Sequence, residues 1–240
     1  KFGRNQQVKY PRPFDLPSDR EIVDLLALAR ELGINLLDTA PAYGSSQQRL
    51  GRLLGAGRGD WTIVSKVGEI FEHGESRFDF GHAHTIASVE DSLRALRTDY
   101  LDCVLIHSDG HDLRIFECAG AVDALHELKR RGLIRAHGMS SKTVDGGLRT
   151  VAELDVVMAT CNLDYNDELA VLEAAAQQSK GVLIKKGLMS GHIQGADGVE
   201  RAFAHVFAQP GVSSMIVGTI NPDHLRSNVA TLRRVLSTPV

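Results

Sequence analysis

Four side chains in the first half of the chain have the types and spacing of an acid site. Asp38 is followed five residues later by Tyr43, and Lys66 and His107 come further along the chain. A tyrosine hydroxyl has a pKa of about 10 and donates protons poorly at neutral pH, but a neighbouring ammonium lowers that pKa because it favours the phenolate. Lys66 can supply this ammonium, Asp38 can pair with Lys66, and His107 can hydrogen-bond a substrate oxygen. Such a set is suited to protonating an oxyanion as hydride reaches the adjacent carbon.

Each of these residues alone also has a structural interpretation. An aspartate or a lysine at the end of a strand is often part of a cap or a surface ion pair. His107 alone could be a hydrogen-bonded residue at a rim, and Tyr43 alone could pack on a loop. Four complementary groups on three successive strand ends are much less expected from structure alone, so the combination favours catalysis.

The elements that position these groups are short apolar runs typical of buried parallel strands. Strands are expected at residues 34–37, 61–66, 100–107, 134–139, 156–161, 182–184 and 214–217. A polar residue follows or closes each run at its carboxyl end, in the order Asp38, Lys66, His107, Ser140, Asn162, Lys186 and Thr219. Helices are expected at residues 19–32, 46–54, 85–97, 118–131, 143–152, 168–180, 199–208 and 222–236, and residues 68–83 are expected to form a long loop without regular structure.

This alternation predicts an α/β fold, a (β/α)8 TIM barrel. The carboxyl ends of barrel strands ring one face, where the active site lies, whereas a doubly wound open sheet would spread its polar strand ends along a line. A chain of 240 residues suits one such barrel, so we expect a single domain over residues 1–240. Because a barrel needs eight strands, we expect the first strand to be absent or truncated, lying before residue 1.

Composition limits the class of partner. The net charge is −3, with 27 Lys and Arg against 30 Asp and Glu, which predicts no nucleic-acid partner. No run approaches the roughly 18 apolar residues of a membrane span, and the first residues are not a signal peptide. Cys103, Cys118 and Cys161 have neither CxxC nor metal-ligand spacing. We therefore expect no metal, no membrane association, a cytoplasmic location, and a monomer or small homo-oligomer.

Several motifs resemble those of one enzyme family. They are GINLLDTAPAYG (residues 33–44), the following Arg49-Leu50-Gly51, the strand ending in Ser65-Lys66, LDCVLIHS (101–108), IRAHGMSS (134–141) and VSSMIVGTINPDHLRSN (212–228). In this order, and over nearly the whole chain, they resemble the aldo-keto reductases. The resemblance implies a barrel that binds NADPH, less often NADH, without a Rossmann domain, and that reduces a small-molecule aldehyde or ketone to an alcohol.

The resemblance also implies roles for individual residues. Tyr43 becomes the general acid tuned by Lys66 and Asp38, and His107 orients the carbonyl. Ser140, Ser141 and Asn162 become the carboxamide-binding residues. The other positions implied for the cofactor are Lys185, Lys186, Gly187, Leu188 and Gly191 in a glycine-containing loop, and Gly218, Thr219, Asn221, His224, Arg226 and Asn228 in the last strand-to-helix turn. Because backbone N–H groups at a helix start favour anions, we expect His224 and Arg226 to contact the adenosine 2′-phosphate there.

Two other classes of function stay open. A lysine facing the centre of a barrel, such as Lys66, Lys185 or Lys186, could form a Schiff base, as in an aldolase. A nicotinamide-binding regulatory subunit resembling the β-subunits of potassium channels would share the same barrel.

Overall fold

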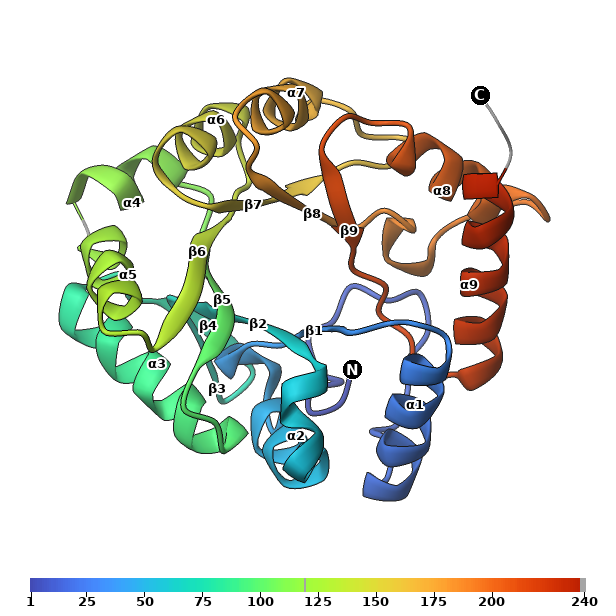
Figure 1. Cartoon of the computed structure of the whole chain (residues 1–240), viewed down its shortest axis with the longest axis horizontal. Coiled ribbons are helices and arrows are strands. Elements are labelled where there is room, and N and C mark those ends of the chain that lie inside the picture. The colour runs from blue at the N-terminus through green and yellow to red at the C-terminus, as the bar shows by residue number, and fades with distance from the viewer. Residues whose placement is uncertain (119, 238–240) are drawn as a thin grey trace.

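The structure is a computed structural model that describes residues 1–118 and 120–237. Within these residues, one sheet contains seven parallel strands in the order β1-β2-β5-β6-β7-β8-β9. Their bounds are β1 (Leu36–Asp38), β2 (Thr62–Val67), β5 (Leu101–His107), β6 (Ile134–Ser140), β7 (Val156–Thr160), β8 (Gly181–Lys185) and β9 (Val212–Met215). The sheet curls around a central axis, as Figure 1 shows, and the expected α/β barrel architecture is confirmed with these seven strands. The eighth strand is not among the described residues, so its expected place before residue 1 stays a prediction.

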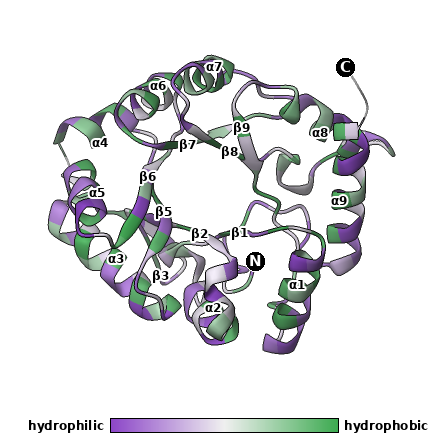
Figure 2. Ribbon diagram, in the orientation of Figure 1, coloured by the Kyte–Doolittle hydropathy of each residue, from purple (hydrophilic) through white to green (hydrophobic). Residues whose placement is uncertain are grey.

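Helices cover the outside of the curled sheet (Figure 1). They are α1 (Asp19–Glu31), α2 (Ser46–Leu54), α3 (His82–Leu96), α4 (Asp112–Cys118), α5 (Ala121–Arg130), α6 (Val144–Glu153), α7 (Leu169–Gln177), α8 (Gly198–Phe207) and α9 (Pro222–Ser237), with short 3-10 helices η1 (Pro41–Tyr43), η2 (Gly55–Asp60) and η3 (Met189–Gly191). Each long helix turns its apolar stripe to the sheet because that face loses contact with water when it packs. Figure 2 shows the resulting alternation of hydrophobic and hydrophilic residues along the helices.

The strands bury side chains on both faces, as parallel strands under helices do. One set packs against the helices and includes Ile63, Val104 and Ile106. Alternate residues point the other way, and these fill the inside of the curled sheet. The inner set is Val64, Cys103, Leu105, Met158 and Leu183. The polar residues at the carboxyl ends of the strands therefore lie next to the apolar side chains that fill the inside of the curled sheet.

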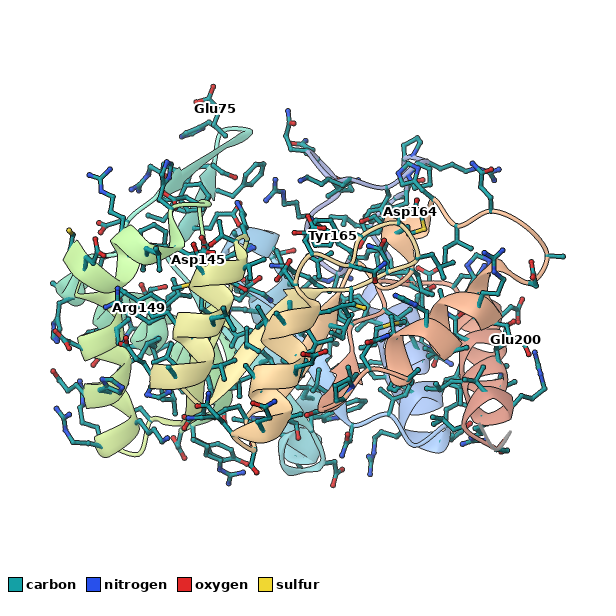
Figure 3. The ribbon with its side chains drawn as sticks, turned by 90° about the horizontal axis from the view of Figure 1, so that it is seen from above. Glu75, Asp145, Arg149, Asp164, Tyr165 and Glu200 are labelled. Atoms are coloured by element: carbon teal, nitrogen blue, oxygen red, sulfur yellow. The ribbon has the colours of Figure 1, made fainter. Side chains whose placement is uncertain are left out.

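Two expectations about the connections are wrong. Residues 68–83 are not a loop without structure: they contain an antiparallel hairpin of β3 (Glu69–Glu72) and β4 (Glu75–Phe78), and α3 begins at His82. The hairpin turns at His73 and Gly74, both with positive φ, which is the conformation that a two-residue hairpin turn requires. In Figure 3 the hairpin, marked by Glu75, stands at the same end of the molecule as the loop that carries Asp164 and Tyr165.

The helix expected at residues 118–131 is also wrong as a single element. The described residues form α4 up to Cys118 and α5 from Ala121, and residue 119 lies outside the described part of the chain. Gly120 has a φ of 69°, a left-handed conformation that a continuous helix does not contain. The chain therefore turns between two helices where sequence periodicity predicts one.

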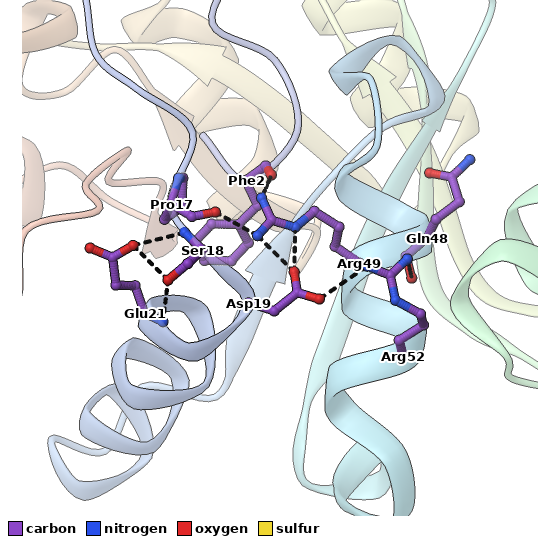
Figure 4. Close-up of polar contacts among 8 residues, drawn as sticks. All are labelled: Phe2, Pro17, Ser18, Asp19, Glu21, Gln48, Arg49 and Arg52. Carbon is purple, nitrogen blue, oxygen red and sulfur yellow. Dashed lines mark hydrogen bonds and ion pairs between the residues drawn. The ribbon is translucent and has the colours of Figure 1, made fainter.

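Arg49 joins the N-terminal segment to the first two helices (Figure 4). It donates hydrogen bonds to the carbonyl oxygens of Phe2 and Pro17, at 2.7 and 2.5 Å, and to Asp19 Oδ1 at 2.9 Å. Ser18 and Glu21 cap the start of α1 reciprocally, each side chain bonding to the backbone N–H of the other residue. Residues 1–18 are thereby fixed beside β1, close to the residues expected to do chemistry.

Candidate active site

The strand register brings the polar ends of neighbouring strands to one level. Asp38 is paired with Val64 on β2, two residues before Lys66, and Lys66 is paired with Leu105 on β5, two residues before His107. His107 in turn is paired with Ser140 on β6. Because alternate residues share a face, Asp38, Lys66 and His107 lie above the apolar residues of the inner set.

Asp38 and Lys66 form the predicted ion pair. Lys66 Nζ lies 2.5 Å from Asp38 Oδ1 and donates a second hydrogen bond, of 3.1 Å, to the carbonyl oxygen of Thr39. The Lys66 side chain is 2% exposed. Burial alone lowers the pKa of Lys66, but Asp38 and Tyr43 raise it above its usual value, so Lys66 keeps its charge.

Tyr43 closes η1, a tight turn that Pro41 begins. Lys66 Nζ lies 4.9 Å from the centroid of the Tyr43 ring. Burial raises the pKa of Tyr43 above its usual value. Lys66 acts in the expected direction and lowers that pKa, whereas Asp38 adds to the rise. Excluding water disfavours the phenolate by more than the ammonium stabilises it. Tyr43 is therefore a protonated hydroxyl at neutral pH, able to donate.

His107 lies across from Tyr43. Their ring centroids are 6.2 Å apart and the ring planes are nearly perpendicular, at 89°. Burial lowers the pKa of His107, against the opposing effect of Glu69, so the imidazole is neutral at pH 7.

Glu69 is a site residue that sequence reasoning missed. Its Oε2 atom lies 2.6 Å from His107 Nδ1. The signal that could have identified it is the hairpin: the apolar residues Ile70 and Phe71 come before His73-Gly74 and Phe78 comes after it, on two short strands joined by a tight turn. A hairpin starting directly after β2 would return over the strand ends, where His107 lies.

The predicted carboxamide-binding residues come together at the ends of β6, β7 and β8. Ser140, Ser141 and Asn162 are buried. Lys185 donates a hydrogen bond of 3.0 Å to Ser140 Oγ and a second hydrogen bond to the carbonyl oxygen of Ser141. Burial lowers the pKa of Lys185 to about 8, the largest of several effects on it.

The loop after β8 holds the next group of predicted cofactor residues. Asn162 donates a hydrogen bond of 3.2 Å to the carbonyl oxygen of Lys186, which ties this loop to β7. Lys186, Met189 and Ser190 all have positive φ, an unusual conformation for residues other than glycine that clusters at functional sites. Gly187 is buried against Met215, where a Cβ would meet the sulfur at 2.2 Å, while Leu188 is half-buried and Gly191 exposed.

The last strand-to-helix turn differs from the expectation in one respect. Asn221 Oδ1 accepts hydrogen bonds from the backbone N–H groups of Asp223 and His224, at 2.8 and 3.2 Å. These N–H groups at the start of α9 are therefore capped by the protein itself. Any anion held here would be bound by the exposed side chains of His224 and Arg226 instead.

The other positions of this turn lie around that cap. Thr219 Oγ1 accepts a hydrogen bond of 3.1 Å from the Asn221 N–H, and Asn228 lies half-buried on α9. At Gly218 a Cβ would meet the Tyr10 hydroxyl at 2.4 Å, so the N-terminal segment packs on this turn.

The donor set at the strand ends fits a nicotinamide head group. A carboxamide both donates and accepts hydrogen bonds, and the side chains of Ser140, Ser141 and Asn162 can each do both. Ser140 ends β6, the strand next to the one that carries His107, while Ser141 follows β6 and Asn162 follows β7, one strand further on. Among the described residues, no three His, Cys, Asp or Glu side chains are grouped to hold a metal ion.

The family model described as the aldo/keto reductase family matches residues 12–198 of the chain. With most of the chain matched, the protein belongs to this family of oxidoreductases.

Its relatives agree with this assignment. It is 53% identical to a putative aldo-keto reductase from Pseudomonas aeruginosa, whose crystal structure has a TM-score of 0.91 over 99% of this chain and 88% of that one. The holo form of an aldo-keto reductase from Bacillus halodurans is 25% identical, with a TM-score of 0.80 over 93% of this chain and 84% of that chain.

Curated relatives include D-arabinose 1-dehydrogenase of Saccharomyces cerevisiae, which is 30% identical over 64% of this chain and 49% of that protein. An uncharacterized oxidoreductase of Bacillus subtilis is 27% identical over 89% of this chain and 83% of that protein. The match thus spans about half the length of some curated relatives and most of others. None of the helices in residues 1–118 and 120–237 is long and apolar enough to cross a membrane.

Proposed function

We propose that the protein is an NADPH-dependent reductase that converts an aldehyde or ketone into an alcohol, with NADH as a possible alternative cofactor. The observation that supports this most strongly is the buried Lys66 ammonium, held 2.5 Å from Asp38 and 4.9 Å from the centroid of the Tyr43 ring. A lysine this deeply buried keeps its charge only where a partner stabilises it. Keeping this ammonium buried costs desolvation free energy. Beside the neutral Tyr43 hydroxyl, the ammonium can stabilise the phenolate that remains when Tyr43 gives up its proton.

Each residue of the site has a distinct part in this proposal. A nicotinamide cofactor, when bound, would supply the hydride for the carbonyl carbon. Tyr43 donates its proton to the carbonyl oxygen, and Lys66 stabilises the phenolate that remains. Asp38 keeps Lys66 charged and aimed at Tyr43, while His107 orients the substrate.

The residues proposed to bind the cofactor divide between its two ends. Ser140, Ser141 and Asn162 would hold the carboxamide, and Lys185 would lie beside them. The loop of residues 186–191 would lie along the pyrophosphate, and His224 and Arg226 would meet the adenosine 2′-phosphate. The similarity to D-arabinose 1-dehydrogenase, and to a methylglyoxal reductase of Escherichia coli that is 35% identical over 46% of this chain, supports a small carbonyl substrate.

The proposal is tested by replacing Tyr43 with Phe. Tyr43→Phe removes the proton and keeps the ring, so turnover should fall by about 100- to 10,000-fold while cofactor affinity changes little. The measurement is NADPH absorbance with a panel of aldehydes, ketones and sugars, beside fluorescence titration of the cofactor. Tyr100→Phe is a matched control, because Tyr100 lies just before β5, with its ring against Arg58 and Arg135.

Turnover of Tyr43→Phe within a factor of three of the wild type would remove Tyr43 from the mechanism. Slow turnover of the wild type on every substrate, with tight retention of the cofactor, would instead favour a regulatory nicotinamide-binding role.

One observation favours a Schiff-base aldolase as a second candidate. Lys185 has its pKa lowered to about 8, so a substantial fraction of its amine is unprotonated near neutral pH. Borohydride treatment in the presence of a carbonyl compound would attach that compound to Lys185 in an aldolase, which mass spectrometry would detect. Lys185→Arg is the matched control, and a reductase would show no such adduct.

A further inference from the structure

Lys185, the last residue of β8, brings a cation to the residues proposed to hold the nicotinamide head group. It has the same parity as Leu183, which belongs to the inner set, so its side chain points to the inside of the curled sheet. Its Nζ atom donates a hydrogen bond of 3.0 Å to Ser140 Oγ and a second one to the carbonyl oxygen of Ser141. Lys185 therefore contacts two of the three proposed carboxamide-binding residues directly.

The hydrogen-bond acceptors of Lys185 do not neutralise its charge. They are a hydroxyl and a carbonyl oxygen, whereas the other buried lysine of the site, Lys66, has a carboxylate at 2.5 Å. The carboxylate of Glu168 joins the same network through Ser141, whose hydroxyl donates to Glu168 Oε2 at 3.5 Å. Glu168 opposes the effect of burial on the pKa of Lys185 without cancelling it. The positive charge of Lys185 is therefore only partly offset.

Lys185 is mainly an ammonium below pH 8. Burial is the largest effect that lowers its pKa, which is about 8. The charged groups that act on it from the neighbouring elements are Glu168, Lys186, Asp112 and Lys142. The two carboxylates raise the pKa of Lys185 and the two lysines lower it. His107 also interacts with Lys185, but burial lowers the pKa of His107 below 6.5, so the imidazole is neutral where Lys185 titrates.

The two redox states of a nicotinamide cofactor differ by one charge on the ring. The reduced ring is neutral and the oxidised ring carries one positive charge, while the amide and the phosphates are the same in both. An amide bonded to Ser140 Oγ would lie within two hydrogen-bond lengths, or about 6 Å, of Lys185 Nζ, and the ring is joined directly to that amide. Two like charges about 10 Å apart at a partly buried site repel enough to change an affinity by about tenfold.

We propose that Lys185 makes the nicotinamide site specific for the redox state of the cofactor, because its ammonium repels the oxidised, cationic ring but not the reduced, neutral one. This inference rests on the proposed binding of a nicotinamide cofactor at Ser140, Ser141 and Asn162. Such a site holds the reduced form and releases the oxidised form, which suits turnover in the direction of carbonyl reduction.

Binding constants test this proposal without any substrate. Isothermal titration calorimetry of the full chain gives the Kd of NADPH and of NADP⁺, with NADH and NAD⁺ as a second pair. In the ratio of the oxidised to the reduced Kd, contacts with the shared parts of the cofactor cancel. At pH 6.5 we expect Lys185→Met to lower this ratio by about tenfold, mainly by tightening the binding of the oxidised form. Lys185→Arg keeps the charge and should keep the ratio.

Two results of this comparison would overturn the proposal. One is a ratio in Lys185→Met within about twofold of the wild type, since a merely structural effect of the substitution changes both constants equally. The other is an equal loss of the ratio in Lys185→Arg, which would assign the effect to the shape of the lysine side chain.

The pH dependence of the wild-type ratio needs no substitution. Lys185 is charged below its pKa of about 8 and neutral above it, so the ratio should be largest at pH 6.5 and should fall by pH 9.5. An arginine stays protonated over this range, so the ratio of Lys185→Arg should stay constant. A wild-type ratio that is the same at both pH values, or an equal fall in Lys185→Arg, would contradict the proposal.

The neighbouring lysine provides a matched control. Lys186 is exposed, so solvent and salt screen its charge, and Lys186→Met should change both constants by the same factor. A ratio that falls as far in Lys186→Met would assign the effect to the general positive charge of the loop and overturn the proposal. Near-UV circular dichroism checks that each variant is folded. If the wild type binds neither NADPH nor NADH, this inference fails together with the proposed function, whereas tight binding with an unchanged ratio refutes this inference alone.

Discussion

Separating Asp38 from Lys66 should cost both stability and activity, and a double-mutant cycle can measure the coupling between them. Asp38→Asn keeps the shape of the side chain but leaves the Lys66 ammonium, 2% exposed, with no anionic partner at 2.5 Å. Removing one member of a buried pair typically costs about 3–5 kcal/mol because the other charge stays buried. For a domain of this size each kcal/mol corresponds to roughly 2–4 °C, so we expect the Tm to fall by roughly 6–20 °C.

Lys66→Met removes the charge and keeps most of the stem, and should be less damaging. Asp38 is 11% exposed and can take up water more easily than Lys66 can. In the double variant neither charge is left buried, so the free energy of unfolding should recover by about 2 kcal/mol relative to the sum of the single changes. Urea unfolding of the four proteins, followed by circular dichroism, gives all the terms of the cycle.

Activity provides the second half of this test. Lys66→Met should fold and bind cofactor yet reduce no carbonyl compound, because the Tyr43 phenolate loses its stabilising ammonium. Asp102→Asn is the control for stability alone, since Asp102 pairs with Arg58 at 2.9 Å in a similarly buried pair that contains no residue of the proposed acid site. It should lower the Tm and keep turnover at low temperature. Additive unfolding free energies, or reductase activity in Lys66→Met, would refute the assignment of the pair.

Two further predictions concern regions away from Tyr43. Replacing His224 and Arg226 together with Ala should weaken NADPH binding more than NADH binding. Both side chains are exposed on the first turns of α9, where we propose that they contact the 2′-phosphate that only NADPH carries. Equal weakening of the two cofactors in fluorescence titration would place the 2′-phosphate elsewhere. His137 is buried with Nδ1 2.8 Å from Asp155, and burial lowers its pKa below 6.5 in spite of Asp155. As the pH falls below 6.5, His137 takes up a proton more readily in the unfolded chain than in the folded one. The contribution of His137 to the free energy of unfolding is therefore complete above pH 6.5 and is lost as the pH falls towards the pKa of His137 in the folded protein. His137→Gln should flatten this loss between pH 7 and pH 5 in urea unfolding, whereas the exposed His192→Gln should not.

The strands were predictable because burial on both faces leaves a strong sequence pattern. Seven parallel strands lie where apolar runs predict them, and the helix expected at 46–54 has those bounds. The predicted pairing of Asp38 with Lys66 is confirmed, since parallel register puts the ends of adjacent strands at one level. The catalytic roles of these residues remain a prediction.

The sequence pattern does not separate two adjacent lysines at the end of one strand. Lys185 and Lys186 both follow the run expected at residues 182–184, but β8 continues to Lys185. Lys185 has the same parity as Leu183 and bonds to Ser140 inside the curled sheet, whereas Lys186 is exposed. The hairpin was missed for a related reason: with only four residues in each strand, its alternation is too short to stand out from a loop.

The pKa of Tyr43 shows why Asp38 and Lys66 must be considered together. Asp38 raises this pKa, and so does burial, while Lys66 lowers it. Asp38 therefore does not act by making the phenol more acidic. Its contribution is to raise the pKa of Lys66 against the effect of burial, so that the ammonium persists where the phenolate will form. Without Asp38, a buried lysine would be stabilised by losing its proton, and Tyr43 would then have no charge nearby to favour its own ionisation. The carboxylate is needed for the proton transfer because it keeps Lys66 charged, even though its direct effect on Tyr43 is unfavourable.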